Sequence, residues 1–347
     1  MKKYFFLLLF ANICLAVNAQ TKSEKEPYLT KSLSGESVNS VTAETSGGNI
    51  SVSGVDPANS RVEVFVSQNS NKLKSLSADE LKAKVSEDYD LDVSVRDSKL
   101  TVTAKSKHRI NDWKKALNFS FRIYVPKDVS TDLETSGGNI ELTGISGSQQ
   151  FETSGGNLVL KSLEGKIKGT TSGGNIYLKD SKDDLDLTTS GGNIDAENSS
   201  GNINLSTSGG SVRLNNLKGN IKAATSGGNV QGATIEGDLS AHTSGGNISL
   251  HELNCGLKAG TSGGNIDVSV KTLVKDISIN NSAGNVNLEI PKNKGIDLKL
   301  YASKISTETL ENFKGKNSKE EIDGTVSGGG IPVTVDAGGG KINLVFN

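Results

Sequence analysis

The chain has 347 residues, with 38 basic and 39 acidic side chains and a formal net charge of −1 at pH 7. This balance argues against a nucleic-acid partner, because phosphate backbones bind to strongly basic surfaces. Of the two cysteines, only Cys255 lies beyond the N-terminal apolar segment, so no internal disulfide is expected once that segment is removed.

Residues 1–19 are predicted to be a cleaved signal peptide. Lys2 and Lys3 precede an apolar run at residues 5–10, and residues 17–19 (Val-Asn-Ala) provide a small-residue cleavage site. The apolar stretch is too short to remain as a membrane span, so we expect no transmembrane segment in the mature chain. We therefore expect export to the periplasm, the cell surface or the medium.

Residues 20–40 are polar and charged and are predicted to form a flexible leader. Residues 41–134 are predicted to form an N-terminal cap and the first coils. This block contains one copy of the phrase Thr-Ser-Gly-Gly-Asn, from Thr45, after which the composition changes. A terminal coil of a repeat fold exposes a raw sheet edge, so an atypical cap is expected there.

The cap is expected to contain an inserted helix and hairpin. Residues 77–80 (Ser-Ala-Asp-Glu) form a capping box that predicts a short helix to about Glu87. Residues 91–95 and 99–104 alternate in polarity around a short polar turn, which predicts a hairpin.

Residues 135–290 are predicted to be a regular solenoid of 18-residue coils. The phrase, always followed by an apolar residue, begins at Thr135, Thr153, Thr171, Thr189, Thr207 (with Ser211 in place of Asn), Thr225, Thr243 and Thr261. A ninth, degenerate copy occupies residues 281–285 and follows after 20 residues. A fixed period of this size is typical of solenoids, in which each coil buries its apolar side chains by stacking on its neighbours.

Each coil is predicted to contain two short strands joined by two corners. Counted from the Thr, apolar residues recur at positions 6, 8, 11, 15 and 17 and alternate with polar ones, as in strands with one buried face. We expect the Thr to face inward and its Ser outward. The Gly-Gly pair is expected to supply a corner with positive φ and room for the next coil. Stacked Thr hydroxyls should bond to the backbone and stacked Asn amides to one another.

Residues 291–347 are predicted to form the final coils and a C-terminal cap, with a charged, irregular excursion at 303–323. The predicted fold class is therefore all-β: a single-stranded parallel β-helix (β-solenoid) with atypical N- and C-terminal caps. We expect it to be right-handed, because crossover connections between parallel strands are right-handed in nearly all known cases.

Three stretches together resemble the bacterial "putative adhesin" family of exported β-solenoid domains. They are residues 121–126 (Phe-Arg-Ile-Tyr-Val-Pro), residues 133–140 (Leu-Glu-Thr-Ser-Gly-Gly-Asn-Ile) and the serial Ser-Gly-Gly units. The resemblance covers most of residues 40–347. It implies a parallel β-helix on the envelope side of the membrane and implies no catalytic residues. The adhesin role follows from analogy, since a fold alone does not give a function.

A repeated calcium site is disfavoured, although glycine-rich calcium repeats can have the same period. Calcium requires charged oxygen ligands in every copy. The residue after Gly-Gly is Asn, and outward position 7 reads Glu141, Val159, Tyr177, Asp195, Arg213, Gln231, Ser249 and Asp267.

A polysaccharide-active lyase or hydrolase is the alternative function, because such enzymes use paired carboxylates. The densest acidic cluster is Asp180, Asp183, Asp184 and Asp186. We expect Lys166 and Lys168, one coil earlier, to pair with this cluster, as opposite charges do on a soluble sheet face. His108, His242 and His251 show no metal-ligand spacing, and Cys255 at position 13 is expected to be a small buried filler.

No catalytic, cofactor-binding or metal-binding residue is predicted, and no cofactor. Tyr177 is the lone aromatic residue of the outward first-strand row, and no outward row is expected to be uniform along the rod. The predicted function is that of a non-catalytic exported β-solenoid, an adhesin-like binding protein or structural scaffold of the cell envelope. Its partner would be an unknown cell-surface protein or glycan, and not nucleic acid.

Overall fold

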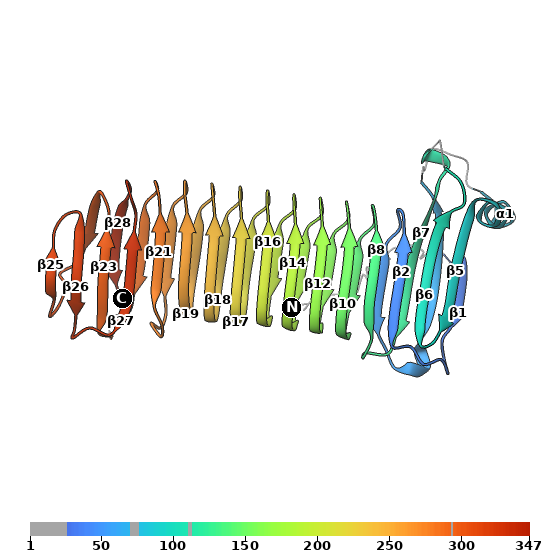
Figure 1. The fold of residues 1–347 in the computed structure, drawn as a ribbon, viewed down its shortest axis with the longest axis horizontal. Helices are drawn as coiled ribbons and strands as arrows, with labels where there is room; N and C mark the ends of the chain where they lie inside the picture. The colour runs from blue at the N-terminus through green and yellow to red at the C-terminus, as the bar shows by residue number, and fades with distance from the viewer. Residues whose placement is uncertain (1–25, 70–75, 110–112, 293) are drawn as a thin grey trace, which may run out of the picture.

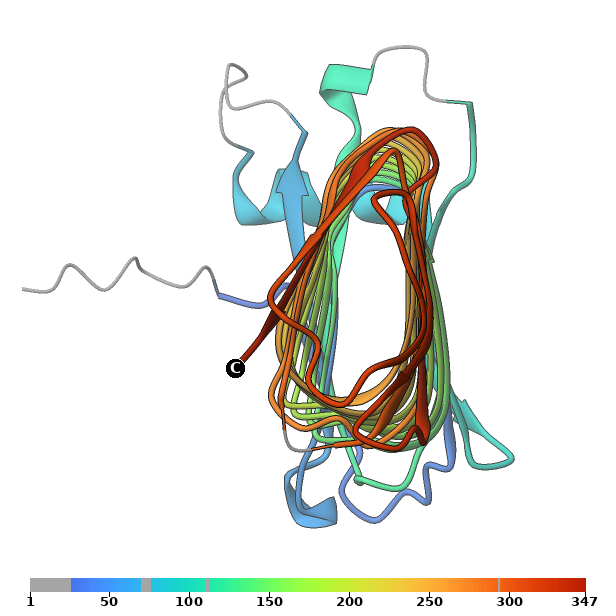
Figure 2. The ribbon, with the colours of Figure 1, turned by 90° about the vertical axis from the view of Figure 1, so that its left-hand side faces the viewer.

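The computed structural model describes residues 26–69, 76–109, 113–292 and 294–347. The predicted signal peptide and the first part of the predicted leader lie outside the described residues. The described chain is all-β, a large and nearly closed β-sheet in a solenoid-like arrangement that forms a straight rod (Figure 1). Seen along the rod, the backbone follows a flattened oval with two long sides (Figure 2).

One long side of the oval is the long-strand sheet. From the N-terminal end of the rod its strands are β5 Tyr89–Arg96, β6 Lys99–Ser106, β2 Ser40–Thr45, β8 Ser130–Thr135, β10 Ser146–Thr153, β12 Glu164–Thr171, β14 Lys182–Thr189 and β16 Ser200–Thr207. The sheet continues through the second halves of β17 Val212–Thr225, β18 Val230–Thr243 and β19 Ile248–Thr261. It ends with β21 Ile277–Asn281, β27 Ile331–Asp336, β23 Ile296–Tyr301, β26 Glu321–Val326 and β25 Lys314–Asn317.

The other long side is the short-strand sheet. Its strands begin with β1 Leu29–Ser32, β4 Arg61–Gln68, β7 Leu117–Val125, β3 Ile50–Gly54, β9 Ile140–Thr143, β11 Leu158–Lys161, β13 Ile176–Lys179 and β15 Ile194–Glu197. The first halves of β17, β18 and β19 follow. The last strands are β20 Ile266–Val270, β22 Val286–Ile290, β28 Lys341–Phe346 and β24 Lys304–Thr307.

In the regular part, successive coils pair in parallel with partners 18 positions apart. Ile176 pairs with Ile194, and Ile203 pairs with Ile221, the same position one coil later. Because side chains alternate between the two faces of a strand, the predicted inward positions form stacked columns in the core. Ile176, Ile194 and Ile221 have no exposed surface. The predicted inward phase of the coil is confirmed.

The Thr of each phrase closes the first corner from inside. Thr189 is buried; its Oγ1 donates to the Gly174 carbonyl oxygen at 2.8 Å and accepts from the Gly192 N–H at 3.2 Å. The same two bonds recur in the coils from Thr153 to Thr261. Backbone groups at this buried corner are thus satisfied by one side chain per coil.

The Gly-Gly pair differs from the prediction, because neither of its glycines has a left-handed φ. Its second glycine is required by close approach instead. A Cβ on Gly192 would lie 2.0 Å from the Gly174 carbonyl oxygen, whereas a Cβ on Gly191 would meet nothing nearer than 3.5 Å.

The Asn ladder also differs from the prediction. The Asn193 backbone N–H donates to Asn175 Oδ1 at 2.8 Å, so the side-chain oxygen bonds to the backbone of the next coil rather than to its amide. Ser211, which replaces Asn in one copy, accepts from the Asn229 N–H through its hydroxyl at 3.2 Å. The hydroxyl preserves the ladder, because it also offers an acceptor at that place.

The left-handed backbone occurs at the opposite corner. Position 10 has a φ of 51° to 65° in Gly144, Ser162, Asp180, Asn198, Asn216, Thr234 and Glu252. Three residues on, the recurrent glycine has a φ of 107° to 125°, in Gly147, Gly165, Gly201, Gly219 and Gly237. Glycine, Asn and Asp tolerate this conformation best, which accounts for the composition of this corner.

At the N-terminal end, one coil is built out of chain order. Thr45 of β2 pairs with Thr135 of β8, 90 residues later, so the solitary phrase stacks directly on the first regular coil. The intervening chain builds the outermost coil and carries α1 (Ala78–Asp88) and two short 3₁₀ turns, Pro57–Asn59 and Trp113–Lys115. The capping box of α1 and the β5–β6 hairpin are present as predicted.

The expected flexible leader is structured where it is described. Strand β1 pairs antiparallel with β4, and Leu33 is fully buried. The Nζ atom of Lys31 donates to the Val93 carbonyl oxygen of β5 at 2.8 Å. This bond joins the outermost strands of the two sheets and helps to close the end of the oval.

The C-terminal end repeats the out-of-order arrangement. Ile277 of β21 pairs with Val333 of β27, which pairs in turn with Leu298 of β23. The last chain segment, β27 and β28, thus lies between the coil of β21 and β22 and the outer coil of β23 and β24. The excursion predicted to be irregular, residues 303–323, contains β24, β25 and the start of β26. Among the described residues, no helix has the length and apolar character needed to cross a membrane.

Candidate binding surface

Positions 7 and 9 of each coil point outward and form two rows along the short-strand face. Tyr177 on β13 lies at position 7 of its coil, in register with Val159 on one side and Asp195 on the other. Its side chain is 42% exposed, and it is the only large hydrophobic side chain this exposed in the described coils between residues 135 and 270. A tyrosine in this setting combines a rigid apolar ring with a polar tip.

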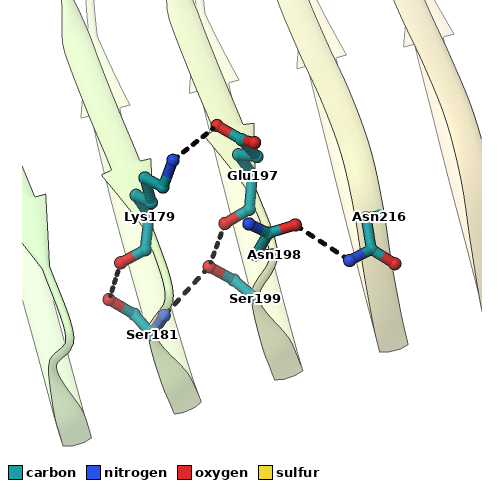
Figure 3. Close-up of polar contacts among 6 residues, drawn as sticks. All are labelled: Lys179, Ser181, Glu197, Asn198, Ser199 and Asn216. Atoms are coloured by element: carbon teal, nitrogen blue, oxygen red, sulfur yellow. Dashed lines mark hydrogen bonds and ion pairs between the residues drawn. The ribbon is translucent and has the colours of Figure 1, made fainter.

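Ion pairs fix the charges around the ring. Asp195 Oδ1 accepts from Arg213 Nη1 at 2.9 Å. Lys179 Nζ lies 3.3 Å from Glu197 Oε2 in the neighbouring row (Figure 3). Exposed pairs of this kind contribute about 0–1 kcal/mol to stability. Their main effect is to hold the charged groups in place.

We call this surface the Tyr177 patch. It surrounds a shallow hollow of about 360 Å³ on the short-strand face. Its outward side chains are Val159, Lys161, Tyr177, Lys179, Asp195, Glu197, Arg213 and Asn215.

The corner next to the patch differs from the same corner in the other coils in its residue at position 11. Position 11 is apolar in most coils, but here it holds the buried residues Ser181 and Ser199 (Figure 3). Ser181 Oγ donates to the Lys179 carbonyl oxygen at 2.9 Å, and Ser199 Oγ donates to that of Glu197 at 2.9 Å. The Ser181 N–H also donates to Ser199 Oγ at 3.1 Å. These hydrogen bonds hold in place the backbone of Lys179 and Glu197, whose side chains form the ion pair.

The predicted acidic cluster does not converge on one point. Asp184 and Asp186 point outward on the long-strand face, while Asp180 lies at the left-handed corner position. Lys166 and Lys168 are in register with Asp184 and Asp186 as predicted, but no ion pair joins them. The two carboxylates instead accept hydrogen bonds from the side chains of Asn202 (2.8 Å) and Asn204 (2.7 Å).

The histidines lie apart, and Cys255 is buried as predicted. His251 Nε2 is 2.9 Å from Ser249 Oγ on the short-strand face, whereas His242 lies on the long-strand face. The described residues contain no His, Cys, Asp and Glu group that could hold a metal ion. Burial raises the pKa of the Cys255 thiol to about 12; nearby Asp238 adds to the rise, and Lys275 opposes it.

One prediction about the rows was wrong. The Ser of each phrase forms a uniform, exposed outward row along the rod, at Ser136, Ser154, Ser172, Ser190, Ser208, Ser226, Ser244 and Ser262. The phrase itself contained the signal, because a residue next to an inward Thr must face outward.

The chain matches the family model described as Toastrack DUF4097 over residues 59–345. The chain belongs to this family. No curated protein matches this Toastrack chain. Among solved structures, it is similar to a "putative cell adhesion protein" from Clostridium sporogenes, at 13% identity over 92% of this chain and 98% of that chain, with a TM-score of 0.19. It is also similar to a "putative adhesin" from Bacteroides fragilis, at 14% identity over 91% and 96%, with a TM-score of 0.25.

Proposed function

We propose that this Toastrack protein is a non-catalytic, adhesin-like binding protein of the cell envelope, which presents the Tyr177 patch to a cell-surface protein or glycan. The observation that carries the proposal is the exposed Tyr177 ring in the middle of a rigid face, beside the Asp195–Arg213 pair. Tyr and Arg are among the residues that most often dominate binding hot spots. The hydrogen-bonded corner next to the patch orders the backbone of Lys179 and Glu197, which reduces the entropy lost on binding.

The proposed function also depends on the architecture of the rod and on export of the chain. We propose a single-stranded, right-handed parallel β-helix of 18-residue coils, with the regular part at 135–290 between caps at 41–134 and 291–347. The parallel register of 18 residues supports the coil size. Export would depend on the signal peptide at residues 1–19.

A polysaccharide lyase or hydrolase is the alternative, and Asp184 and Asp186 would then be its carboxylates. In the structure each of these carboxylates is bonded to an Asn of the next strand, in the manner of polar pairs on a solvated sheet face. This arrangement favours the binding function over catalysis.

The test compares Tyr177→Ala with Tyr301→Ala. Tyr301 is similarly exposed, at 39%, but lies on β23 outside the patch, so it controls for the loss of a surface tyrosine. Wild-type and variant chains would be applied to a glycan array and to surface-labelled envelope proteins. We expect Tyr177→Ala to weaken the main interaction by roughly 30-fold, as at a hot spot, and Tyr301→Ala to leave it unchanged.

Equal binding by all three chains would contradict the assignment of the patch. The array and the protein capture distinguish a glycan from a protein partner. Cleavage of an envelope polysaccharide by wild type, lost in an Asp184→Asn/Asp186→Asn double variant, would replace the binding function with the enzymatic alternative.

A further inference from the structure

The long-strand face carries lysines that have no ion pair within the described chain. They lie at outward positions 14 and 16 of the coils and are Lys166, Lys168, Lys222 and Lys258. Lysines elsewhere on the coils are paired with a carboxylate, at Lys161, Lys179, Lys182, Lys218, Lys271 and Lys275. The long-strand face therefore presents free cations beside carboxylates that are already bonded to Asn.

This face is large enough for a stable interface. Its outward positions 14, 16 and 18 form three rows across nine neighbouring strands, from β8 to β21. At about 4.8 Å between strands and about 3.3 Å per residue along a strand, the rows cover roughly 900 Å². A standard interface buries about 800 Å² per partner.

We propose that the long-strand face docks on a second copy of the chain, with the two rods antiparallel and a twofold axis along β16. This axis places each row on the same row of the second copy and reverses the order of the strands. Strand β14 then faces β17 of the second copy, β12 faces β18, and β10 faces β19. A twofold interface requires such self-complementarity.

Opposite charges meet in this arrangement. Asp186 on β14 faces Lys222 of the second copy, and Lys166 on β12 faces Asp238, which Lys275 also pairs within its own chain at 2.7 Å. The twofold axis doubles each pair, which gives four ionic contacts. Within the three rows on these nine strands, no like charges face each other. Complementary charge sets the register of an interface.

Shape also matches toward the ends of the face. Gly260 leaves a gap in the row at position 18, within a hollow of about 400 Å³ that His242 and Lys258 border. Glu152, an exposed carboxylate, faces this gap from the second copy. No carboxylate lines the hollow itself, so Glu152 would meet hydrogen-bond donors there.

Neighbouring registers bring like charges together. An axis along β17 places Lys222 opposite Lys222 of the second copy. An axis along β14 places Asp186 opposite Asp186 of the second copy. An axis between β14 and β16 places Lys168 on Lys222, and an axis between β16 and β17 places Asp184 on Asp238. If the two rods were parallel, with the twofold axis along the rod, every residue at position 16 would face the same residue of the second copy. In the row at position 12, nearest the corner, the proposed axis places Lys182 opposite Lys218 and Glu164 opposite Glu236 of the second copy. These like charges repel less than free ones, because each chain already pairs Lys182 with Glu164 at 3.0 Å and Lys218 with Glu236 at 3.3 Å.

The test uses two single charge reversals, Asp186→Lys and Lys222→Asp. Each creates two like-charge contacts in the homodimer, so each variant alone is expected to dissociate at least roughly tenfold more readily than wild type. A 1:1 mixture of the two variants restores all the contacts, since the lysines of one chain then face the aspartates of the other. The double variant Asp186→Lys/Lys222→Asp restores them within one chain type.

Sedimentation velocity of the full chains at low and high salt measures the result. We expect a wild-type dimer that weakens with salt, monomeric single variants, and dimers for the mixture and the double variant. Thermal melting confirms that the variants are folded. A wild-type chain that stays monomeric at every concentration, or a mixture that behaves like its separate components, would overturn the proposal.

Discussion

Gly191 and Gly192 are adjacent and identical, yet the fold constrains them differently. A Cβ on Gly192 would overlap the Gly174 carbonyl oxygen at 2.0 Å, and a backbone atom cannot move away without breaking the stacked corner. We expect Gly192→Ala to destabilise the protein by about 1–3 kcal/mol or more, as overpacking does. Gly191→Ala is the matched control and should change stability by less than about 1 kcal/mol. Urea unfolding measures both.

The degenerate copy supports this distinction, because it has Ala283 at the first place and retains Gly284 at the second. If the two alanine variants unfolded at the same urea concentration, the close-approach explanation would be wrong. The sequence alone predicted that the pair avoids crowding, but it could not show which glycine meets a backbone atom.

Cys255 should make stability depend on pH in the alkaline range. Burial raises the pKa of its thiol from 9.0 to about 12. Because the raised pKa belongs to an acid, the folded state keeps the proton that the unfolded state loses, and stability should fall as pH rises from about 9 to 12. The slope is about 1.4 kcal/mol per pH unit.

The measurement compares wild type with Cys255→Ala by urea unfolding at pH 8 and pH 10.5. The difference between the two proteins should shift in favour of the variant at the higher pH. A difference that is the same at both pH values, or rapid labelling of the native thiol, would place Cys255 at the surface.

At the scale of elements, the left-handed corner explains why position 10 is so often Asn, Asp or Gly. Among the position-10 residues named above, Thr234 is the β-branched one, with a φ of 57°. Its neighbour Asn216 donates through its side chain to Asn198 Oδ1 at 2.8 Å. We expect Thr234→Asn to stabilise the protein by roughly 0.5–1 kcal/mol, because Asn tolerates this conformation and extends the ladder. A thermal melt tests it, with Asn216→Thr as the reverse change; no gain from the first and no loss from the second would contradict this explanation.

Elements with a local signal could be predicted, and elements with a distant partner could not. Helix α1 follows from its capping box, and the β5–β6 hairpin follows from alternation around a short turn. Strand β25 is polar and exposed along its length, and it is a strand only because it pairs with β26. The Asn side chains offer donors as well as acceptors, so the sequence left open whether they would bond to amides or to the backbone.

At the scale of the whole molecule, the period predicted stacked coils but not their order. The phrase at Thr45 has the same residues as the phrase at Thr135, and nothing local indicates that the two coils are neighbours. The Tyr177 patch was predicted only in part: alternation placed Tyr177 outward, while the Asp195–Arg213 pair depends on the side-chain conformations of adjacent coils.

The central claim is that 18-residue coils stack in fixed rows and that the Thr45 coil lies next to the Thr135 coil. Spin labels at Ser136→Cys and Ser262→Cys, in a Cys255→Ala background, would lie seven coils apart, or about 34 Å at about 4.8 Å per coil. Labels at Ser46→Cys and Ser262→Cys should lie only one coil farther apart, at about 38 Å. Pulsed electron paramagnetic resonance measures both distances. The predicted result is two narrow distance distributions, one centred near each of these values. A distance near 58 Å for the second pair, as expected if the coils followed chain order at about 4.8 Å each, would contradict the account.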